Sequence, residues 1–553
     1  MTSLERFLSA LFLFTCLLRA AEDHSHHDVG AVHFPVSCAP AAQDRFDRAL
    51  ALLHSFWYDE AERTFAEVLR LDPRCAMAHW GVAMSLFHPL WAAPTPADLA
   101  KGAAAVDKAK SLAPGTQREA EYIAAIQSFY KDWQTSPHRD RAAAWCRGME
   151  RLAARYPGDS EARIFFALAL LGTASPSDKS LRNQKRAAAI LNRILPEQPS
   201  HPGIAHYLIH SYDTPLLANL ALPAARSYAK VAPVVPHALH MPSHIFTRLG
   251  MWQESIDSNL ASARAAREIA AKRYPGATSQ DELHAMDYLV YAYLQTAQDE
   301  QAGRIVADAG RVSKVDQQII PAAYALAAIP ARYALERRRW ADAASLEPHP
   351  SDFLWADFSY AQAITYYARA LGAARSGNPA AARADIQRLA SIGAALSGAA
   401  LQYDWASQVE LQRLSADAWR LHAEGAHDEA LRTMRLAADL EDKTEKHPVT
   451  PGAVLPAREL LADLLMELDS PRLALAEYEA VLRAAPRRFN SVYGAARAAE
   501  LSGNRERAHK RYAELLLLAA QPEGRRLEIE NARAYLRQDR HRSRPRSRNS
   551  AAL

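Results

Sequence analysis

The sequence contains little glycine and few runs of β-branched residues for its length. Only 21 glycines occur among 553 residues, and no stretch alternates β-branched and polar residues as an exposed strand does. This composition argues against a β-sheet protein, because strands depend on β-branched and aromatic residues with a two-residue period. Alanine, leucine and arginine dominate instead, which favours helices throughout. We therefore predict an all-α fold.

Neither sign of charge is in large excess. The formal net charge is +4, which argues against nucleic acid as the main partner. Basic residues are concentrated only at the C-terminus, where six arginines lie between Arg537 and Arg548 and only Asp539 opposes them. We expect residues 536–553 to form a solvated, disordered tail. An anchor to anionic lipid or nucleic acid is the alternative.

Long hydrophobic runs are absent after the first 20 residues. The run from Phe7 to Leu18 follows one arginine and precedes Ala20 and Ala21. It is too short to span a membrane and has the order of a signal peptide, which we assign to residues 1–20. The mature protein should therefore be secreted or periplasmic, with no transmembrane segment after cleavage.

Cysteine is scarce, and no CxxC pair occurs. Cleavage of the signal leaves Cys38, Cys75 and Cys146. In an oxidising compartment Cys38 and Cys75 can form a bridge that ties the leading segment to the first repeat, and buried free thiols are the alternative. The leading segment, residues 21–41, should be flexible. It carries a short tract that attracts metal ions, formed by His24, His26 and His27.

A small residue and a large residue recur four positions apart along much of the chain. The frame also has a proline twelve positions after the small residue, as in Ala61, Phe65 and Pro73. The alanine lets two antiparallel helices approach, and the large residue on the same face fills the groove between them. The proline should start the next helix, where its missing N–H costs nothing. Further copies begin at Ala187, Ala224 and Ala474, and copies without the proline begin at Ala302, Ala430 and Ala508.

This frame resembles the tetratricopeptide repeat (TPR) over residues 42–535. The resemblance implies an α-α superhelix, a TPR-like solenoid of about twelve helix pairs. It also implies a scaffold that binds a protein or peptide partner, or a small ligand, in its concave groove. The motifs FWYDEAERTF, HPLW, HALHMPSHIF and KHPVTPG are similar to those of exported bacterial TPR proteins. That similarity implies a fold and a compartment but no reaction. The repeat register is least certain over residues 115–180 and 315–400.

Two proline-rich stretches, residues 87–98 and 445–460, interrupt the repeats. Proline prevents them from being helical. Each carries a histidine, His88 or His447, and several apolar residues. They are either surface insertions or loops folded into the groove.

Histidines gather in one part of the chain. Seven of the 21 histidines lie between residues 201 and 287. His206, His237 and His284 each precede the small residue of their repeat by 18 positions, so they share one register in the first helices of the fifth to seventh repeats. In proteins that the frame resembles, first helices line the concave surface, where these histidines should stack.

Further polar residues fall on the same helix faces. Spacings of three, four and seven return to one side of an α-helix, and imidazole and carboxylate groups at such spacings suit a Zn, Fe or Cu ion. The candidate metal ligands are His206, His210, His240, His244, His284 and Asp287. The candidate groove residues are Asp213, His237 and Tyr291.

Three interpretations of the histidines stay open: a metal or catalytic site, recognition of a peptide or small ligand without metal, and packing alone. His201 precedes its helix, and His237 lies upstream of Pro242, so both are weaker ligand candidates. Pro242 either kinks a continuous helix or opens the helix after an extended HALHM segment. No HExxH, GxSxG or glycine-rich phosphate loop occurs, so the sequence names no reaction.

Overall fold

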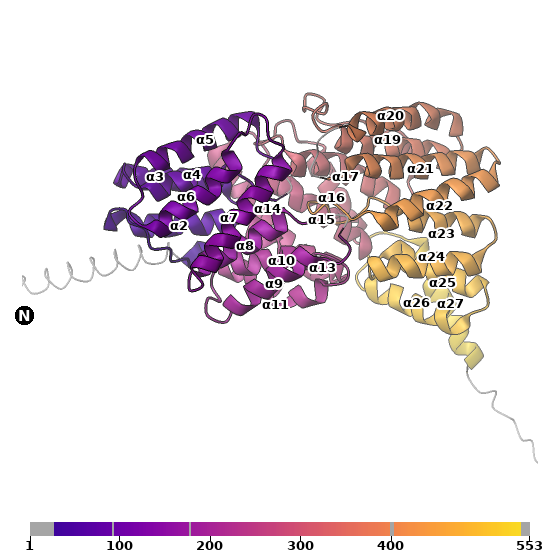
Figure 1. Ribbon diagram of the computed structural model, residues 1–553. Helices are drawn as coiled ribbons and strands as arrows, with labels where there is room; N and C mark the ends of the chain where they lie inside the picture. The colour runs from indigo at the N-terminus through magenta and orange to yellow at the C-terminus, as the bar shows by residue number, and fades with distance from the viewer. Residues whose placement is uncertain (1–26, 91–92, 176–177, 399–402, 544–553) are drawn as a thin grey trace, which may run out of the picture. The chain divides into compact units, whose positions relative to one another are not determined.

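The computed structural model is built from helices (Figure 1). It describes residues 27–90, 93–175, 178–398 and 403–543, and no β-strand occurs in these ranges. The prediction of an all-α fold is confirmed. The signal peptide predicted for residues 1–20 lies outside the described residues. The chain divides into two compact units, residues 1–245 and 246–553.

The first unit consists of five consecutive helix pairs, and each pair packs on the next. A single turn of 3₁₀-helix occurs at His27–Val29, Pro40–Ala42 and Ala218–Ala221. The pairs are formed by α2 (Gln43–His54) and α3 (Tyr58–Leu71), α4 (Ala76–Ser85) and α5 (Pro96–Ser111), α6 (Gln117–Tyr130) and α7 (His138–Arg155), α8 (Ser160–Gly172) and α9 (Arg182–Ile194), and α10 (Pro202–Tyr212) and α11 (Leu222–Val231). Two short helices follow, α12 (Pro236–His240) and α13 (Pro242–Arg248).

The second unit begins with the long helix α14 (Trp252–Arg273), continues with six further pairs and ends on α27 (Leu527–Ser543). The pairs are α15 (Gln280–Gln295) and α16 (Asp299–Ala309), α17 (Ile320–Glu336) and α18 (Trp340–Ala344), α19 (Ser359–Arg375) and α20 (Pro379–Ser397), α21 (Trp405–Ala423) and α22 (His427–Lys443), α23 (Ala457–Glu467) and α24 (Pro471–Ala484), and α25 (Phe489–Leu501) and α26 (Arg505–Leu518). The repeat number is therefore close to the prediction. None of the described helices is both long and apolar enough to cross a membrane.

The small–large frame packs as the sequence predicts. Ala61 and Phe65 of α3 are completely buried. A Cβ atom at Gly81 of α4 would overlap the Phe65 ring, so the second pair approaches the first only because position 81 has no side chain. Gly494 of α25 accommodates Tyr478 of α24 in the same way. Burial of these apolar faces stabilises the stack.

The prediction for the proline of the frame is correct in one copy and wrong in three. Pro236 is the first residue of α12. Pro73, Pro199 and Pro486 instead lie in the turns, three residues before α4, α10 and α25 begin. In those turns proline fixes the backbone without opening a helix, because its φ also suits extended and turn conformations.

The leading segment is packed rather than flexible over residues 28–41, which corrects the prediction for 21–41. Phe34 is completely buried, and its ring stacks on Trp80 with centroids 5.9 Å apart. The Phe34 backbone N–H donates to Asp47 at 2.9 Å. Cys38 and Cys75 form a disulfide, with their Cα atoms 4.9 Å apart. The segment orders because it buries an aromatic side chain and is covalently tied to the repeats.

Both proline-rich loops pack against their own units in the residues described. In the first loop, the Phe87 ring lies against Phe129, with centroids 3.8 Å apart, and Leu90 is buried. In the second, His447 and Leu455 are 2% and 5% exposed. Neither loop is therefore a simple surface insertion, because each adds apolar side chains to a core.

The last helix extends into the segment predicted as a basic tail. α27 continues to Ser543, past the predicted boundary at 535. Tyr535 packs on Tyr512 with ring centroids 4.8 Å apart, and Asp539 forms an ion pair with Arg505 at 2.7 Å. These contacts hold the end of α27 on α26. Residues 544–553 lie outside the described chain.

Candidate metal centre

The helices of the fifth repeat and of the segment after it position five histidines. His206 and His210 lie one turn apart on α10, a helix that Pro202 opens. Pro242 has no N–H, so the helix that begins at Pro236 ends at His240 and a new helix begins at Pro242. His237 and His240 therefore lie on α12 and His244 on α13. The segment HALHM is helical, which excludes the extended lead-in.

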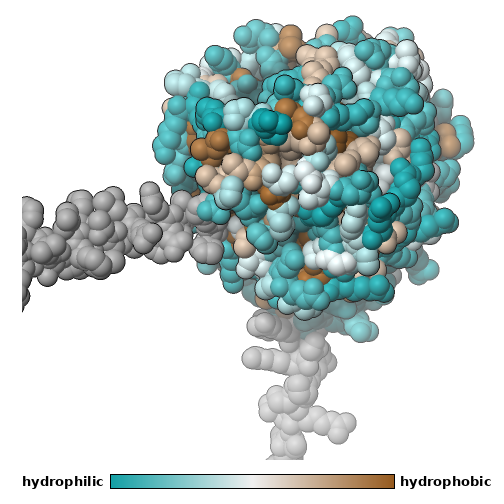
Figure 2. Space-filling model, turned by 60° about the vertical axis from the view of Figure 1, so that its left-hand side comes forward, coloured by the Kyte–Doolittle hydropathy of each residue, from teal (hydrophilic) through white to brown (hydrophobic). Residues whose placement is uncertain are grey.

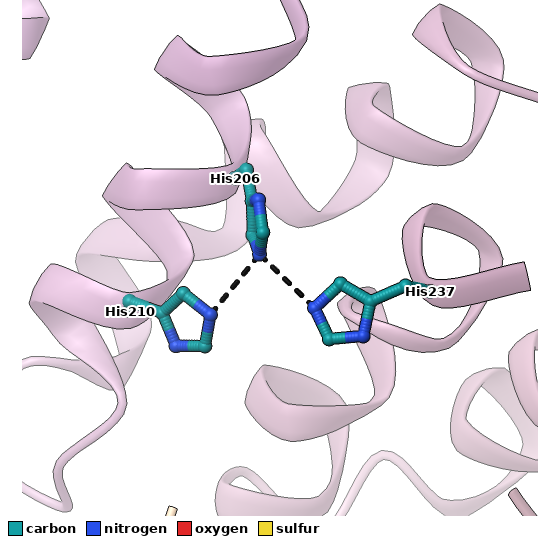
Figure 3. Close-up of side chains that lie close together, drawn as sticks. All are labelled: His206, His210 and His237. Carbon is teal, nitrogen blue, oxygen red and sulfur yellow. Dashed lines mark hydrogen bonds between the residues drawn. The ribbon is translucent and has the colours of Figure 1, made fainter. Parts of the chain in front are cut away.

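Three imidazole nitrogens meet between α10 and α12 (Figure 3). The Nε2 atoms of His210 and His237 each lie 3.1 Å from Nε2 of His206. One ring nitrogen from each residue lies within 4.8 Å of the others, close enough to hold one ion. His206 is completely buried, and its two neighbours are partly buried.

The tautomer of His206 is fixed by the backbone of α2. Its Nδ1 lies 2.7 Å from the carbonyl oxygen of His54. A carbonyl can only accept, so Nδ1 carries the hydrogen and Nε2 has a single lone pair. That lone pair can accept one hydrogen bond, yet two imidazole nitrogens face it at the same distance. A cation shared by the three nitrogens satisfies all of them. Two nitrogens bound to one tetrahedral ion are about 3.3 Å apart, close to the separation observed.

The electrostatics keep His206 in the form that binds metal. Burial lowers the pKa of His206 well below its ordinary value, and the charge of a protonated His210 would lower it further. The imidazole is therefore neutral at physiological pH, which is the state in which histidine is a ligand. The hydrogen bond from Nδ1 to a backbone carbonyl is the usual outer contact of a metal-bound histidine.

A second pair of histidines lies beside the first three. Nε2 of His240 is 3.0 Å from Nε2 of His244, and Nδ1 of His244 is 3.1 Å from the Asp213 carboxylate. The two histidines are 2% and 3% exposed. Asp213, predicted as a groove residue, contacts His244, and its role in a groove stays a prediction.

Aromatic rings cover the three-histidine cluster. The Phe56 ring lies 4.3 Å from the His206 ring and 5.8 Å from the His237 ring, between centroids. Tyr228 also stacks on His206, with ring centroids 5.2 Å apart. Phe56 has a φ of +56°, a left-handed conformation that it shares with Ala297, Arg338 and Asp469 at the same place in other inter-helix turns. This aromatic wall shields His206 from water, while His210 and His237 stay partly exposed.

A second buried group, His54, Glu161 and His201, supports the centre. His54 and His201 each approach one Glu161 oxygen through Nε2, at 3.0 Å and 2.6 Å. Nδ1 of His54 is 2.9 Å from the Tyr207 hydroxyl. Burial alone would raise the pKa of Glu161, but the charges and hydrogen bonds of the two histidines outweigh it and hold the pKa well below its usual value.

This group has the three donors of a metal site, but hydrogen bonds account for Glu161 and His54 without an ion, and only Nδ1 of His201 is buried without a hydrogen-bond partner among these residues. A carboxylate accepts one N–H from each imidazole, and the Tyr207 hydroxyl donates to the remaining nitrogen of His54. A Cβ at Gly203 would lie 2.6 Å from Nδ1 of His54, so this glycine lets α2 approach α10. We interpret the group as a support that fixes the His54 carbonyl opposite His206.

The remaining predicted site residues belong to α15 in the second unit. Asp287 forms a buried ion pair with Arg332, at 3.1 Å. Tyr291 is 4% exposed and contacts the Arg488 guanidinium at 3.3 Å. His284 is also buried, at 7% exposure. Their roles as ligands or groove residues stay predictions from the repeat register.

No known protein-family model matches the chain, and no curated protein matches it. Several solved structures are similar over most of the chain, at 11–13% identity, a level at which the likeness concerns the fold alone. Yeast Tom70 has 13% identity, 91% coverage of this chain and 97% of its own, and a TM-score of 0.32. A human IFIT1 dimer with m7Gppp-AAAA has 13% identity, 81% and 90% coverage, and a TM-score of 0.37. The Cut9–Hcn1 hetero-tetramer of the APC/C has 11% identity, 90% and 89% coverage, and a TM-score of 0.30.

Proposed function

We propose that the protein is an exported helical-repeat metalloprotein that binds a transition-metal ion through His206, His210 and His237. The observation that carries this proposal is the single Nε2 lone pair of His206, which two further imidazole nitrogens face at 3.1 Å. One lone pair accepts one good hydrogen bond, whereas one cation can be bound by all three nitrogens together.

The ligand set narrows the chemistry. Imidazole nitrogens suit Zn, Fe and Cu, and disfavour Mg and Ca, which prefer oxygen ligands. Three protein ligands leave a coordination position for water or a substrate, as catalytic zinc sites do. The aromatic wall at Phe56 would limit water near that position, so that electrostatic interactions with a bound ligand would be stronger than in water.

The burial of the histidines favours a metal site over peptide recognition by these residues. A peptide needs accessible side chains along a groove, but His206 is completely buried. The helical-repeat fold itself suits a protein-binding scaffold, so a partner would bind other surfaces. The face drawn in Figure 2 is mostly hydrophilic and carries hydrophobic residues in small groups.

The disulfide supports the proposed export. Such bridges persist outside the cytoplasm and are rare within it, and Cys38 and Cys75 are bridged. N-terminal sequencing of the mature protein tests this part of the proposal. A chain that begins near Ala21 or Glu22 is expected, and an intact Met1 on folded cytosolic protein would contradict export.

The metal proposal is tested with tag-free full-length protein whose leader histidines are replaced by serine, so that His24, His26 and His27 cannot bind metal. The purified protein is titrated with Zn²⁺ and Cu²⁺, and bound metal is counted by elemental analysis. His206→Ala should weaken binding about 100-fold or more, because it removes a ligand, whereas changes outside the ligand shell cost 10–100-fold.

His33→Ala is the matched control, because the His33 side chain is 75% exposed and lies outside the cluster. It should bind metal as the parent does. A parent protein that takes up no metal, or a His206→Ala variant with unchanged affinity and helix content, would reject the proposed function.

A further inference from the structure

The second histidine pair repeats the design of the first cluster. His206 and His210 are separated by four positions, and so are His240 and His244. In each pair the two Nε2 atoms face each other, at 3.1 Å and 3.0 Å. The two pairs therefore present the same donor atoms, at nearly the same separation, from α10 and from the segment that Pro242 divides.

Asp213 fixes His244 as the His54 carbonyl fixes His206. The carboxylate oxygen lies 3.1 Å from Nδ1 of His244, and an ionised carboxylate can only accept. Nδ1 therefore carries the hydrogen, and Nε2 offers its lone pair toward His240. A carboxylate behind a histidine is a frequent outer contact of metal-bound imidazole, and it makes the ring a stronger ligand.

The two histidine groups are close enough to hold neighbouring ions. The His210 and His244 ring centroids are 6.1 Å apart, and those of His237 and His240 are 6.3 Å apart. A bound ion lies roughly 3 Å from the ring centroid of its imidazole ligand, given a bond of ~2.0–2.1 Å. Rings at the observed separations can thus coordinate two ions that lie about 3.5–4 Å apart, the spacing of two-metal sites.

We propose that a second transition-metal ion binds His240 and His244, so that the first unit holds a pair of ions instead of one. This inference rests on the proposed function, because it assumes the first ion at His206, His210 and His237. Two adjacent ions held by imidazoles would keep coordination positions open for an oxygen donor such as water or hydroxide. The pair would bind and polarise small oxygen-containing ligands.

The test counts ions per chain in the protein that lacks the leader histidines. Zn²⁺ or Cu²⁺ is supplied in excess, unbound metal is removed, and metal and protein are quantified together. The parent should retain two ions, and the double variant His240→Ala/His244→Ala should retain one. The matched double control, His33→Ala/His509→Ala, changes two histidines whose side chains are 75% and 48% exposed and should retain two.

The outcomes separate this inference from the proposed function. One ion in the parent, lost in His206→Ala, would overturn the second site and leave the first intact. No ion in the parent would reject both. Two ions in the folded double variant would also overturn the second site. Should the double variant fail to fold, the count in the parent still decides, and Asp213→Asn should weaken the second ion about 10–100-fold while the first is unchanged.

Discussion

Single residues in this protein owe their chemistry to groups far away in the sequence. The tautomer of His206 is set by the backbone of His54, 152 positions earlier. Glu161 meets His54 across 107 positions and His201 across 40. Each of these polar side chains is buried, and each is held by partners that the fold brings to it.

His447 shows the same effect in the second unit. Its ring stacks on Trp405 with centroids 4.8 Å apart, and the Val449 N–H donates to its Nδ1 at 3.2 Å. Burial, with a smaller effect from the charge of Lys446, lowers the pKa of His447 to about 3. The ring therefore stays neutral in the fold at pH values where an exposed histidine takes up a proton.

We predict that His447 makes the second unit sensitive to acid. Below a pH of about 6.5 the unfolded chain binds a proton at this residue that the folded chain does not. Its contribution is therefore intact above that pH and is lost progressively down to the folded pKa. The free energy of unfolding should fall by up to about 1.4 kcal/mol per pH unit through this residue. Urea unfolding at pH 7, 5.5 and 4.5, with EDTA present, measures it.

His447→Gln should lose less stability than the parent over this range, since glutamine does not titrate. The exposed His427 provides the control, and His427→Gln should follow the parent. Equal pH dependence of His447→Gln and the parent would show that this residue is not responsible.

The sequence predicted part of the candidate site. The spacing of the repeats and the periodicity of the helix predicted that five histidines share one region, because both are local properties of the sequence. These are His206, His210, His237, His240 and His244. Neither property indicated His54, Glu161 or Phe56, whose contacts depend on how α2 and α8 pack against α10. The ion pair of Asp287 with Arg332 likewise follows from packing between α15 and α17.

At the scale of elements, the close packing of successive helices depends on positions that have no side chain. Gly81 of α4 receives the Phe65 ring of α3, and Gly494 of α25 receives the Tyr478 ring of α24. The small–large frame predicted the helix pairs well because both members lie on one helix. It did not predict these glycines, which belong to the following helix and are defined only by the close approach.

We predict that Gly81→Ala destabilises the first unit by about 1–3 kcal/mol, as overpacking does. Alanine favours the helix by about 1 kcal/mol, but its Cβ would overlap the Phe65 ring and force α4 away from α3. Urea unfolding followed by circular dichroism measures the change. Gly158→Ala is the control, because no atom lies within 4 Å of a Cβ there. Equal stability of the two variants would show that α4 can shift without cost.

At the scale of the whole molecule, the described chain consists of helix pairs that pack on their neighbours within each unit, and one disulfide adds a covalent tie in the first unit. The disulfide between Cys38 and Cys75 closes a loop with a sequence separation of 37. The bridge ties the leading segment to the residue that precedes α4. In the same segment, the backbone N–H of Ser37 donates a hydrogen bond to the Glu119 carboxylate of α6 at 2.5 Å. The leading segment therefore contacts each of the first three pairs.

We predict that Cys38→Ser/Cys75→Ser lowers the stability of the first unit by about 2–4 kcal/mol, as loss of a native bridge does. Urea unfolding under non-reducing conditions should show the difference, and a reductant should bring the parent to the level of the variant. Cys146→Ser is the control, because Cys146 is a free thiol. A parent that unfolds equally with and without reductant would contradict a stabilising bridge.

The covering of the histidine centre bears on how fast an ion can be exchanged. His206, His240 and His244 are at most 3% exposed, and the Phe56 ring lies against the first of them. An ion bound as proposed would reach water only past the partly exposed His210 and His237 or through local opening around α10 and α12. Where that opening limits the exchange, an excess of chelator would remove the ion at a rate that does not depend on the chelator concentration.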